Sequence, residues 1–327
     1  MTEPRQYLCY RAAEPLTLTG SLDKPFWRDA DWTADFVDIE GGRGPKPRYR
    51  TRAKMLWDDE FLYIGAEMEE PHVWATLTEH DCVIFRDNDF EVFIEPDGDN
   101  HDYYELEINA LNTTWDLRLV KPYRDGGPAL NEWEIPGFRS AVAIAGTLND
   151  PCDMDTGWSV EMAFPWKALA EYARCPSPPR DGDQWRINFS RVEWDIEIDY
   201  GAYRKVEGRP EHNWVWTPQG VIDMHRPERW GYVQFTSAAP GAGRFLPDPA
   251  IPAREALMAV YHAQRAFRER AGRWAEANEL PKALTGGITI TSTADGFDAH
   301  CDVSLETGAN VRWHVRHDSL LWRDPAG

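Results

Sequence analysis

Two stretches of alternating residues, 89–95 and 103–109, constrain the fold more than any other feature of this chain. In both stretches apolar residues alternate with mainly acidic ones, and an Asp/Gly/Asn-rich segment separates them. A period of two is typical of half-buried strands, so the sequence predicts a hairpin whose loop is centred near Asp99. In that register Glu91 lies opposite Glu107 on the outward face, where like charges destabilise a strand pair. A cation, an arginine from a neighbouring strand, open water or a hydroxyl-rich ligand must compensate them.

The composition excludes several classes of partner. The chain has 327 residues, of which 42% are hydrophobic and 28% are charged, as expected for a globular protein. Its net charge of -20, with no compact basic run, argues against binding to nucleic acid or to an anionic membrane surface. We therefore expect neither partner.

The cysteines and the N-terminal residues indicate the cellular compartment in which the protein is expected. Five cysteines are scattered without CxxC spacing, which predicts neither a cysteine-based zinc site nor a dense disulfide framework. The first residues show no apolar signal-peptide region, and no stretch approaches the roughly 18 apolar residues of a membrane span. By default we expect a cytoplasmic protein, although the family resemblance given below would also suit an exported one.

Further alternating stretches, separated by turns that contain Gly or Pro, continue to residue 235. About ten short strands without a strand–helix rhythm predict an all-β fold, an antiparallel β-sandwich, over residues 1–237. Residues 238–252, with four interleaved prolines, are expected to form a linker. Residues 253–327 are expected to form a small α+β appendage of one helix and a β-meander. A predicted strand at residues 115–120 places Arg118 beside Glu105 as a countercharge.

Five short sequence blocks follow one another along the predicted sandwich. They are residues 20–23 with Trp27, 56–64, 89–94, 158–166 and 226–231. Together, over roughly residues 12–236, they resemble the family 9 carbohydrate-binding modules and their family 9-like relatives. This resemblance implies a β-sandwich, calcium sites and sugar binding.

The resemblance also implies a site. Members of the family hold a sugar between two tryptophans and bind its hydroxyls with polar side chains. Glu91 takes the position of the family's carboxylate, Glu107 that of its arginine and Ser190 that of its glutamine, while the two tryptophan positions fall near Phe85 and Met224. Other tryptophans are candidates to replace the missing platform. The candidate ligand-binding residues are Glu91, Glu107, Phe85, Trp74, Trp115, Arg118, Asn188, Ser190, Trp194 and Trp216.

Calcium has candidate ligands at two turns. Hard cations bind six to eight oxygen ligands, and Asp97, Asp99 and Asp102 supply carboxylates within one loop, while Asp58 does so at the turn of an earlier hairpin. The spacing is not that of an EF-hand loop. An equally good interpretation is that these residues only form the turns.

We expect a non-catalytic protein that binds an oligo- or polysaccharide on its acidic sheet face, stabilised by calcium. One alternative is a glycoside hydrolase or lyase that uses a pair of these carboxylates. Another is a structural or haem-binding relative of the sandwich, with Met68, or Met224 and His225, as axial ligands. The sequence does not name the glycan or any protein partner of residues 253–327.

Overall fold

The computed structural model describes residues 3–304 and 310–324, and they form two compact units. The sandwich unit comprises the residues up to Asp97, Asp102–Val120 and Ala129–Phe245, and the C-terminal unit comprises Gly98–His101, Lys121–Pro128 and the residues from Leu246 onward. The break between Phe245 and Leu246 falls within the predicted linker. Each unit is described separately below.

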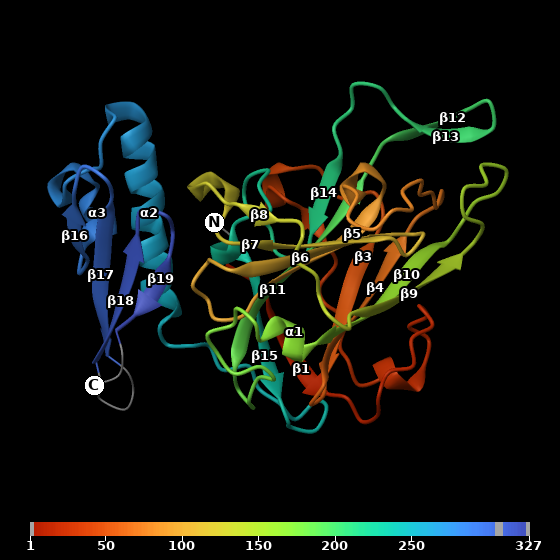
Figure 1. The fold of residues 1–327 in the computed structure, drawn as a ribbon, viewed down its shortest axis with the longest axis horizontal. Coiled ribbons are helices and arrows are strands. Elements are labelled where there is room, and N and C mark those ends of the chain that lie inside the picture. The colour runs from red at the N-terminus through yellow and green to blue at the C-terminus, as the bar shows by residue number, and fades with distance from the viewer. Residues whose placement is uncertain (1–2, 305–309, 325–327) are drawn as a thin grey trace. The chain divides into compact units, whose positions relative to one another are not determined.

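The sandwich unit is built on a curled sheet of 13 strands (Figure 1). The main path through the sheet runs β8-β7-β6-β5-β11-β15-β1-β3-β4-β10-β9, and β14 and β2 branch from β11. The strands are β1 (Gln6–Arg11), β2 (Val37–Asp38), β3 (Thr51–Trp57), β4 (Phe61–Glu69), β5 (Asp89–Glu95), β6 (Tyr103–Asn109), β7 (Thr114–Leu119), β8 (Ala129–Leu130), β9 (Arg139–Ala145), β10 (Gly157–Pro165), β11 (Gln184–Glu193), β14 (His212–Val215) and β15 (Gly231–Thr236). A separate hairpin pairs β12 (Ile196–Asp199) with β13 (Ala202–Lys205), and α1 (Trp166–Leu169) follows β10.

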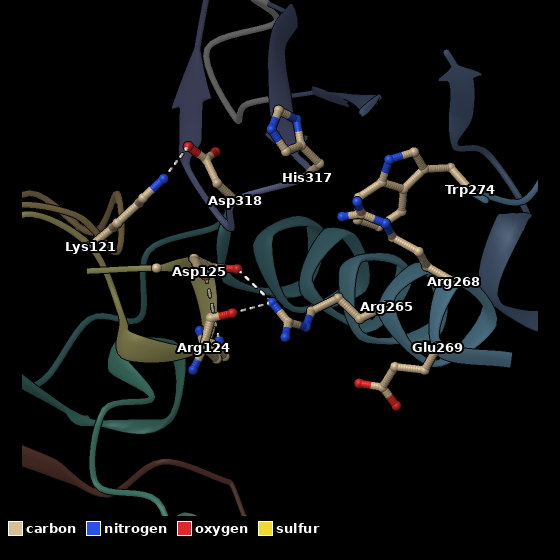
Figure 2. A pocket seen from close by; sticks show the side chains of 10 residues that line it. Lys121, Arg124, Asp125, Arg265, Arg268, Glu269, Trp274, His317 and Asp318 are labelled. Carbon is tan, nitrogen blue, oxygen red and sulfur yellow. Dashed lines mark hydrogen bonds and ion pairs between the residues drawn. The ribbon is translucent and has the colours of Figure 1, made fainter. Parts of the chain in front are cut away.

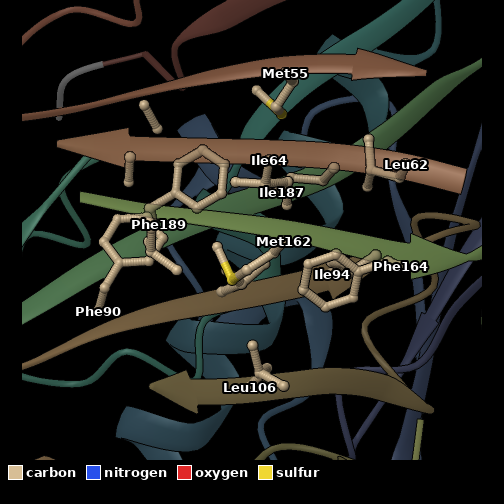
Figure 3. Close-up of a cluster of buried hydrophobic side chains, with 14 of the residues drawn as sticks. Met55, Leu62, Ile64, Phe90, Ile94, Leu106, Met162, Phe164, Ile187 and Phe189 are labelled. Atoms are coloured by element: carbon tan, nitrogen blue, oxygen red, sulfur yellow. The ribbon is translucent and has the colours of Figure 1, made fainter. Parts of the chain in front are cut away.

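The main core of the sandwich lies between the two halves of this sheet. Along the central strands apolar residues recur at every second position and point into one cluster, as the period of two requires, although β11 ends with Arg191 and Glu193 on this face. Figure 3 shows Ile64 of β4 and Met162 of β10 among side chains from the other half, including Ile94 of β5 and Phe189 of β11. The predicted antiparallel β-sandwich is confirmed, although β1 pairs in parallel with β15 and β3.

The central hairpin forms in the predicted register. β5 and β6 pair antiparallel, with Glu91 directly opposite Glu107. Of the four possible compensations for these acids, open water is excluded, because every residue of both strands is buried. A second apolar cluster, which includes Phe93 and Tyr103 from these strands, lies under Trp230 on that face. The hairpin is therefore covered on both sides.

The expectation that Arg118 neutralises Glu105 is wrong. In the observed register Arg118 pairs with Tyr104, whereas Glu105 pairs with Leu117. Because successive side chains alternate between faces, this shift of one residue puts the guanidinium on the other face of the sheet. There Arg118 forms an ion pair with Asp102 and lies 3.6 Å from the centre of the Tyr172 ring.

The C-terminal unit packs a helix on a four-stranded sheet. The helix α2 (Ile251–Ala271) has Pro252 in its first turn and ends at Gly272, whose φ of 70° suits a residue without a side chain. One face of α2 packs against residues such as Phe297 and Val315 of the sheet. The other elements are α3 (Lys282–Thr285), β16 (Thr289–Ser292), β17 (Phe297–Ser304), β18 (Asn310–Arg316) and β19 (Leu321–Arg323). Among the described residues no helix has the length and apolarity needed to cross a membrane.

We expect Phe189→Ala to lower the free energy of unfolding of the sandwich by about 3–5 kcal/mol, because it removes a fully buried ring and leaves a cavity. Urea titration followed by tryptophan fluorescence measures this loss. Tyr200→Ala is the control, since Tyr200 is 97% exposed and its removal should change stability by less than about 0.5 kcal/mol. Equal effects of the two substitutions would contradict the assignment of the core.

Candidate functional site

Five carboxylates share the face of the central hairpin that is turned away from the main core: Glu95, which is opposite Arg186 of β11, and four others. Alternation along β5 and β6 places Asp89, Glu91, Glu105 and Glu107 on this side, and we call these four residues the acidic face. Their exposed fractions are 0%, 6%, 5% and 2%, respectively. Carboxylates are almost never this buried unless they are paired. The acidic face therefore needs an explanation.

No ion pair within the described chain neutralises the acidic face, although the charge of Lys205 interacts with that of Asp89 over a longer distance. None of its four carboxylates has a Lys, Arg or His nitrogen within 4.0 Å among the residues 3–304 and 310–324. Backbone N–H groups supply part of the solvation: that of Val192 donates to Asp89 Oδ1 at 3.1 Å, and that of Phe85 donates to Glu107 Oε2 at 2.8 Å. Asp89 Oδ2 and Glu105 Oε2 are buried without a hydrogen-bond partner. These two oxygens lose their hydrogen bonds to water on folding and gain none in return, which costs free energy.

Another buried carboxylate of the same unit shows how this chain satisfies an acid that has only a structural role. Glu161 on β10 is 0% exposed, and Lys24 lies 2.7 Å from its Oε1. The indole of Trp27 donates to the same oxygen, and the backbone N–H groups of Thr19 and Gly20 donate to Oε2. The acidic face has no comparable set of donors.

Burial and mutual repulsion raise the pKa values of the acidic face. Burial raises the pKa of Glu91 to about 7, and the hydroxyl of Ser190 opposes this effect. Burial, followed by the charge of Glu91, raises the pKa values of Asp89, Glu105 and Glu107 well above their usual range. Glu91 is thus the central member, since its charge acts on each of the other three. At neutral pH these groups must hold protons or meet a ligand that compensates their charge.

The acidic face has suitable geometry for a hard cation. One oxygen from each of Asp89, Glu91 and Glu107 lies within 4.8 Å of the others. Calcium binds oxygen at about 2.4 Å, so oxygens on opposite sides of one ion lie about 4.8 Å apart. A single ion can therefore contact all three residues, with its other ligands supplied by water or by a bound hydroxyl compound.

Aromatic residues adjoin the acidic face on one side. Phe85, whose N–H binds Glu107, is partly buried, and its carbonyl accepts a bond of 2.9 Å from Nε1 of Trp194. The ammonium of Lys205 lies 3.5 Å from the centre of the Trp194 ring. Of these two predicted site residues, Phe85 is therefore bonded to Glu107 through its backbone, and Trp194 is connected to Glu107 only through Phe85.

A second pair of apolar side chains adjoins the neighbouring strand. Trp115 of β7 is directly opposite Glu107 of β6, and it is partly buried. Trp115 and Met224 both pack at the margin of the cluster around Phe93 and Trp230. The positions that the family resemblance assigns to its two tryptophans, near Phe85 and Met224, thus lie in the surroundings of the carboxylates.

Strand β11 completes the face. Ser190 is opposite Glu91, and Asn188 is opposite Phe93. The amide of Asn188 is held by the backbone of Thr217, because it donates one hydrogen bond of 2.9 Å to the Thr217 carbonyl and accepts one of 2.9 Å from the Thr217 N–H. The Thr217 carbonyl also accepts a bond from Gln219, and both Thr217 Oγ1 and Gln219 Oε1 are buried without a partner. The segment after β14 therefore places two polar atoms that can still form hydrogen bonds next to Asn188.

Two other predicted ligand-binding tryptophans are buried. Trp216 is 1% exposed and packs edge-on against Tyr7 in the main core. Trp74 is 6% exposed, and its Nε1 has no hydrogen-bond partner among the described residues. Arg118, also predicted for the site, is engaged by Asp102 as described above. We leave these three residues out of the binding proposal.

The aspartates predicted for calcium accept hydrogen bonds from their own turns or from nearby residues. Asp58 Oδ1 accepts the N–H groups of Glu60 and Phe61. Asp97 accepts the N–H of Arg174, Asp99 accepts that of His101, and Asp102 is paired with Arg118. These contacts are those expected of turn-forming aspartates.

Sequence reasoning missed three polar residues near this face. Asp89 follows the same alternation as Glu91, which could have identified it as a ligand candidate. Thr217 and Gln219 carried no comparable signal, since their position depends on how the segment after β14 folds over β11. Of the proposed haem ligands, Met68 is buried in the main core, while His225 Nδ1 lies 3.0 Å from the Tyr103 hydroxyl.

A separate cavity of about 480 Å³ lies within the C-terminal unit (Figure 2). Its cationic side chains have partners: Arg265 binds Asp125 at 2.8 Å, Lys121 lies 3.7 Å from Asp318, and the Arg268 guanidinium lies 4.5 Å from the centre of the Trp274 ring. These contacts account for the charges of the cavity without a ligand. The acidic face remains the leading candidate site.

Comparison with known proteins agrees with the geometry. The profile of the family described as "Carbohydrate family 9 binding domain-like" matches residues 18–179. Over 152 residues, 46% of this chain, the sequence is 26% identical to exoglucanase XynX of Acetivibrio thermocellus and 23% identical to endo-1,4-beta-xylanase A of Thermoanaerobacterium saccharolyticum. These matches span 12% and 11% of the two relatives, respectively, so the chain corresponds to a small part of each.

A solved structure shows a similar fold. A candidate carbohydrate-binding protein from Bacteroides uniformis is 16% identical, with a TM-score of 0.53 over 71% of this chain and 99% of that protein. A family 9 carbohydrate-binding module from Caldicellulosiruptor kristjanssonii in complex with cellotriose is 13% identical, with a TM-score of 0.48 over 75% of this chain and all of that module. The profile match supports a family 9 carbohydrate-binding module-like protein over residues 18–179, and the Bacteroides uniformis structure supports the β-sandwich fold.

Proposed function

We propose that the sandwich unit binds an oligo- or polysaccharide at the acidic face without cleaving it. The observation that carries the proposal is the set of four buried carboxylates that form no ion pair with the described residues, although the same unit gives Glu161 a complete set of donors. Sugar hydroxyls are donors that would compensate such acids. The relatives support this choice, since the Caldicellulosiruptor module is in complex with cellotriose in one structure and with glucose in another.

Binding would combine two kinds of contact. Glu91 and Glu107 would accept charge-assisted hydrogen bonds from sugar hydroxyls, which are stronger than neutral ones. Phe85 and Trp115, which adjoin Glu107 from two different elements, would cover the apolar faces of the pyranose ring. We expect an affinity in the micromolar range or weaker, which corresponds to about -8 kcal/mol or less negative.

We further propose that calcium stabilises the acidic face, bound through Asp89, Glu91 and Glu107 and not at the predicted turns. The support is twofold: their oxygens lie within 4.8 Å of one another, and Asp89 Oδ2 is buried without a partner. An ion there would lower the repulsion between Glu91 and Glu107 and leave coordination positions for water or vicinal hydroxyls. Glu105 Oε2, also without a partner, would stay available for a hydroxyl donor.

Sugar binding is tested with Glu91→Gln and Trp115→Ala. We expect each to weaken binding to the best glycan by about tenfold, or about 1.4 kcal/mol, because one removes the charge of the acceptor and the other removes a ring. A glycan array identifies the ligand, and titration calorimetry measures affinity. Glu132→Gln and Tyr200→Ala, at exposed positions, are the matched controls.

The same samples are examined for products by chromatography. Retention without turnover supports a binding protein. Turnover that is lost in Glu91→Gln would instead support the glycoside-active enzyme, and unchanged affinity in both variants would remove the acidic face from the binding site.

Calcium is tested by thermal unfolding in chelator and in excess Ca²⁺. We expect Ca²⁺ to raise the midpoint by several degrees, since a ligand at about 100 times its dissociation constant stabilises the folded state by about 2.7 kcal/mol. Asp89→Asn with Glu107→Gln should abolish the increase, whereas Asp58→Asn should leave it intact. The reverse pattern would place the ion at the first hairpin turn, and equal midpoints with and without Ca²⁺ would refute a stabilising ion.

The raised pKa of Glu91 predicts the pH dependence of stability in chelator. In the folded protein Glu91 holds its proton up to about pH 7, whereas the unfolded chain releases it near pH 4.5. The stabilising contribution is thus complete below about pH 4.5 and is lost as pH rises through 7. Urea titrations at pH 5 and pH 8 should show a smaller decrease for Glu91→Gln than for the wild type. Glu60→Gln, exposed at a turn, is the control, and parallel pH slopes for all three proteins would contradict the assignment.

A further inference from the structure

Three potential metal ligands come together on the four-stranded sheet of the C-terminal unit. β17 and β18 pair antiparallel with His300 directly opposite His314, and Asp298 lies two residues before His300 on the same face. Their neighbours Ala299 and Val315 point to the other face, into the core under α2. The histidines and the aspartate thus lie on the face turned away from that core, where their side chains are between 15% and 40% exposed.

The distances within this group are those of a metal site. Asp298 Oδ1 is 3.3 Å from His314 Nδ1 and 3.8 Å from His300 Nδ1, and one ligand atom from each residue lies within 4.8 Å of the others. Zinc binds nitrogen and carboxylate oxygen at about 2.0–2.2 Å, which separates neighbouring ligands of a tetrahedral ion by about 3.3 Å. Small rotations of the side chains would bring all three to one ion.

A carboxylate beyond the group orients His314. Its Nε2 lies 3.1 Å from Asp324 Oδ1. If Nε2 donates to Asp324, Nδ1 of the neutral ring carries a lone pair that faces the carboxylate of Asp298. Two lone pairs at 3.3 Å repel, so a proton or a metal ion must lie between them. A histidine held by an outer carboxylate is a recurring feature of metal sites. The Trp322 ring, stacked on His314 at 4.7 Å with an interplanar angle of 11°, fixes the ring orientation further.

We propose that Asp298, His300 and His314 form a binding site for a divalent transition-metal ion, best represented by Zn²⁺. Two imidazole nitrogens favour zinc, nickel or copper over calcium or magnesium. The nearby carboxylate of Asp302 does not compete for the ion, since Arg312 binds both of its oxygens, at 2.8 and 3.2 Å. Three protein ligands on an accessible face leave a coordination position for water or for a group of a partner molecule. This site is independent of sugar binding by the sandwich unit.

The test is a Zn²⁺ titration of the full chain in excess Ca²⁺, which saturates oxygen-only sites. We expect one Zn²⁺ per chain in the wild type and none in His300→Gln or His314→Gln. Asp324→Asn should retain the site but weaken it by about 10- to 100-fold, because it loses the outer carboxylate. In the Co²⁺ form, visible d–d absorption should appear in the wild type and disappear in the two histidine variants.

His80→Gln is the matched control, since His80 forms the other described group that combines a histidine with carboxylates, Asp81 and Asp116. It should bind Zn²⁺ like the wild type. Circular dichroism and the thermal midpoint measured without Zn²⁺ show whether each variant is folded. The proposal is overturned if the double variant His300→Gln/His314→Gln binds Zn²⁺ as the wild type does, if only His80→Gln loses it, or if neither Zn²⁺ nor Co²⁺ binds stoichiometrically.

Discussion

The repulsion between Glu91 and Glu107, which face each other on paired strands inside the protein, is the constraint on which the sandwich unit depends. Elsewhere the chain matches a buried acid with local donors. Glu161 has Lys24, Trp27 and two backbone N–H groups, and Arg191 lies 2.8 Å from both Glu70 and Glu193. The acidic face instead combines four acids with an apolar cover and few donors. Such an arrangement keeps carboxylates desolvated, and a desolvated acceptor gains more from a hydroxyl or a cation than one already surrounded by water.

Local pattern was sufficient to predict the hairpin and the pairing of its acids. The alternation in residues 89–95 and 103–109 determines which side chains share a face, and the Asp/Gly/Asn turn determines the register. The β-sandwich followed from the repetition of such stretches. The same alternation could not show that the outward face is covered, because its cover comes from Met224 and Trp230, more than 100 residues later in the chain. Burial on that face is a long-range property.

A contact between two particular side chains could be predicted only where the pairing register of their strands could also be predicted. A shift of one position moved Arg118 from Glu105 to Tyr104, and its charge is used by Asp102 on the other face. Trp216 was a candidate stacking residue on composition alone, yet it directly follows β14 and its side chain packs in the core beside Tyr7. The pair His300 and His314 illustrates the opposite case, since residues 14 positions apart give no sequence signal and become neighbours only through the pairing of β17 with β18.

The division of the chain into units has a consequence for its dissection. Gly98–His101 and Lys121–Pro128 belong to the C-terminal unit, although strands of the sandwich flank them in sequence. Within that unit His101 Nε2 lies 2.7 Å from the Asp318 carbonyl, and Asp125 accepts hydrogen bonds from Tyr261 and Ser319. Cleavage after Phe245 would strip these two loops of their partners and leave buried polar groups exposed or unpaired. Neither unit is therefore a continuous segment of the chain. Expressing one unit alone, or fusing it to another protein, requires redesign of the loops that belong to the other unit.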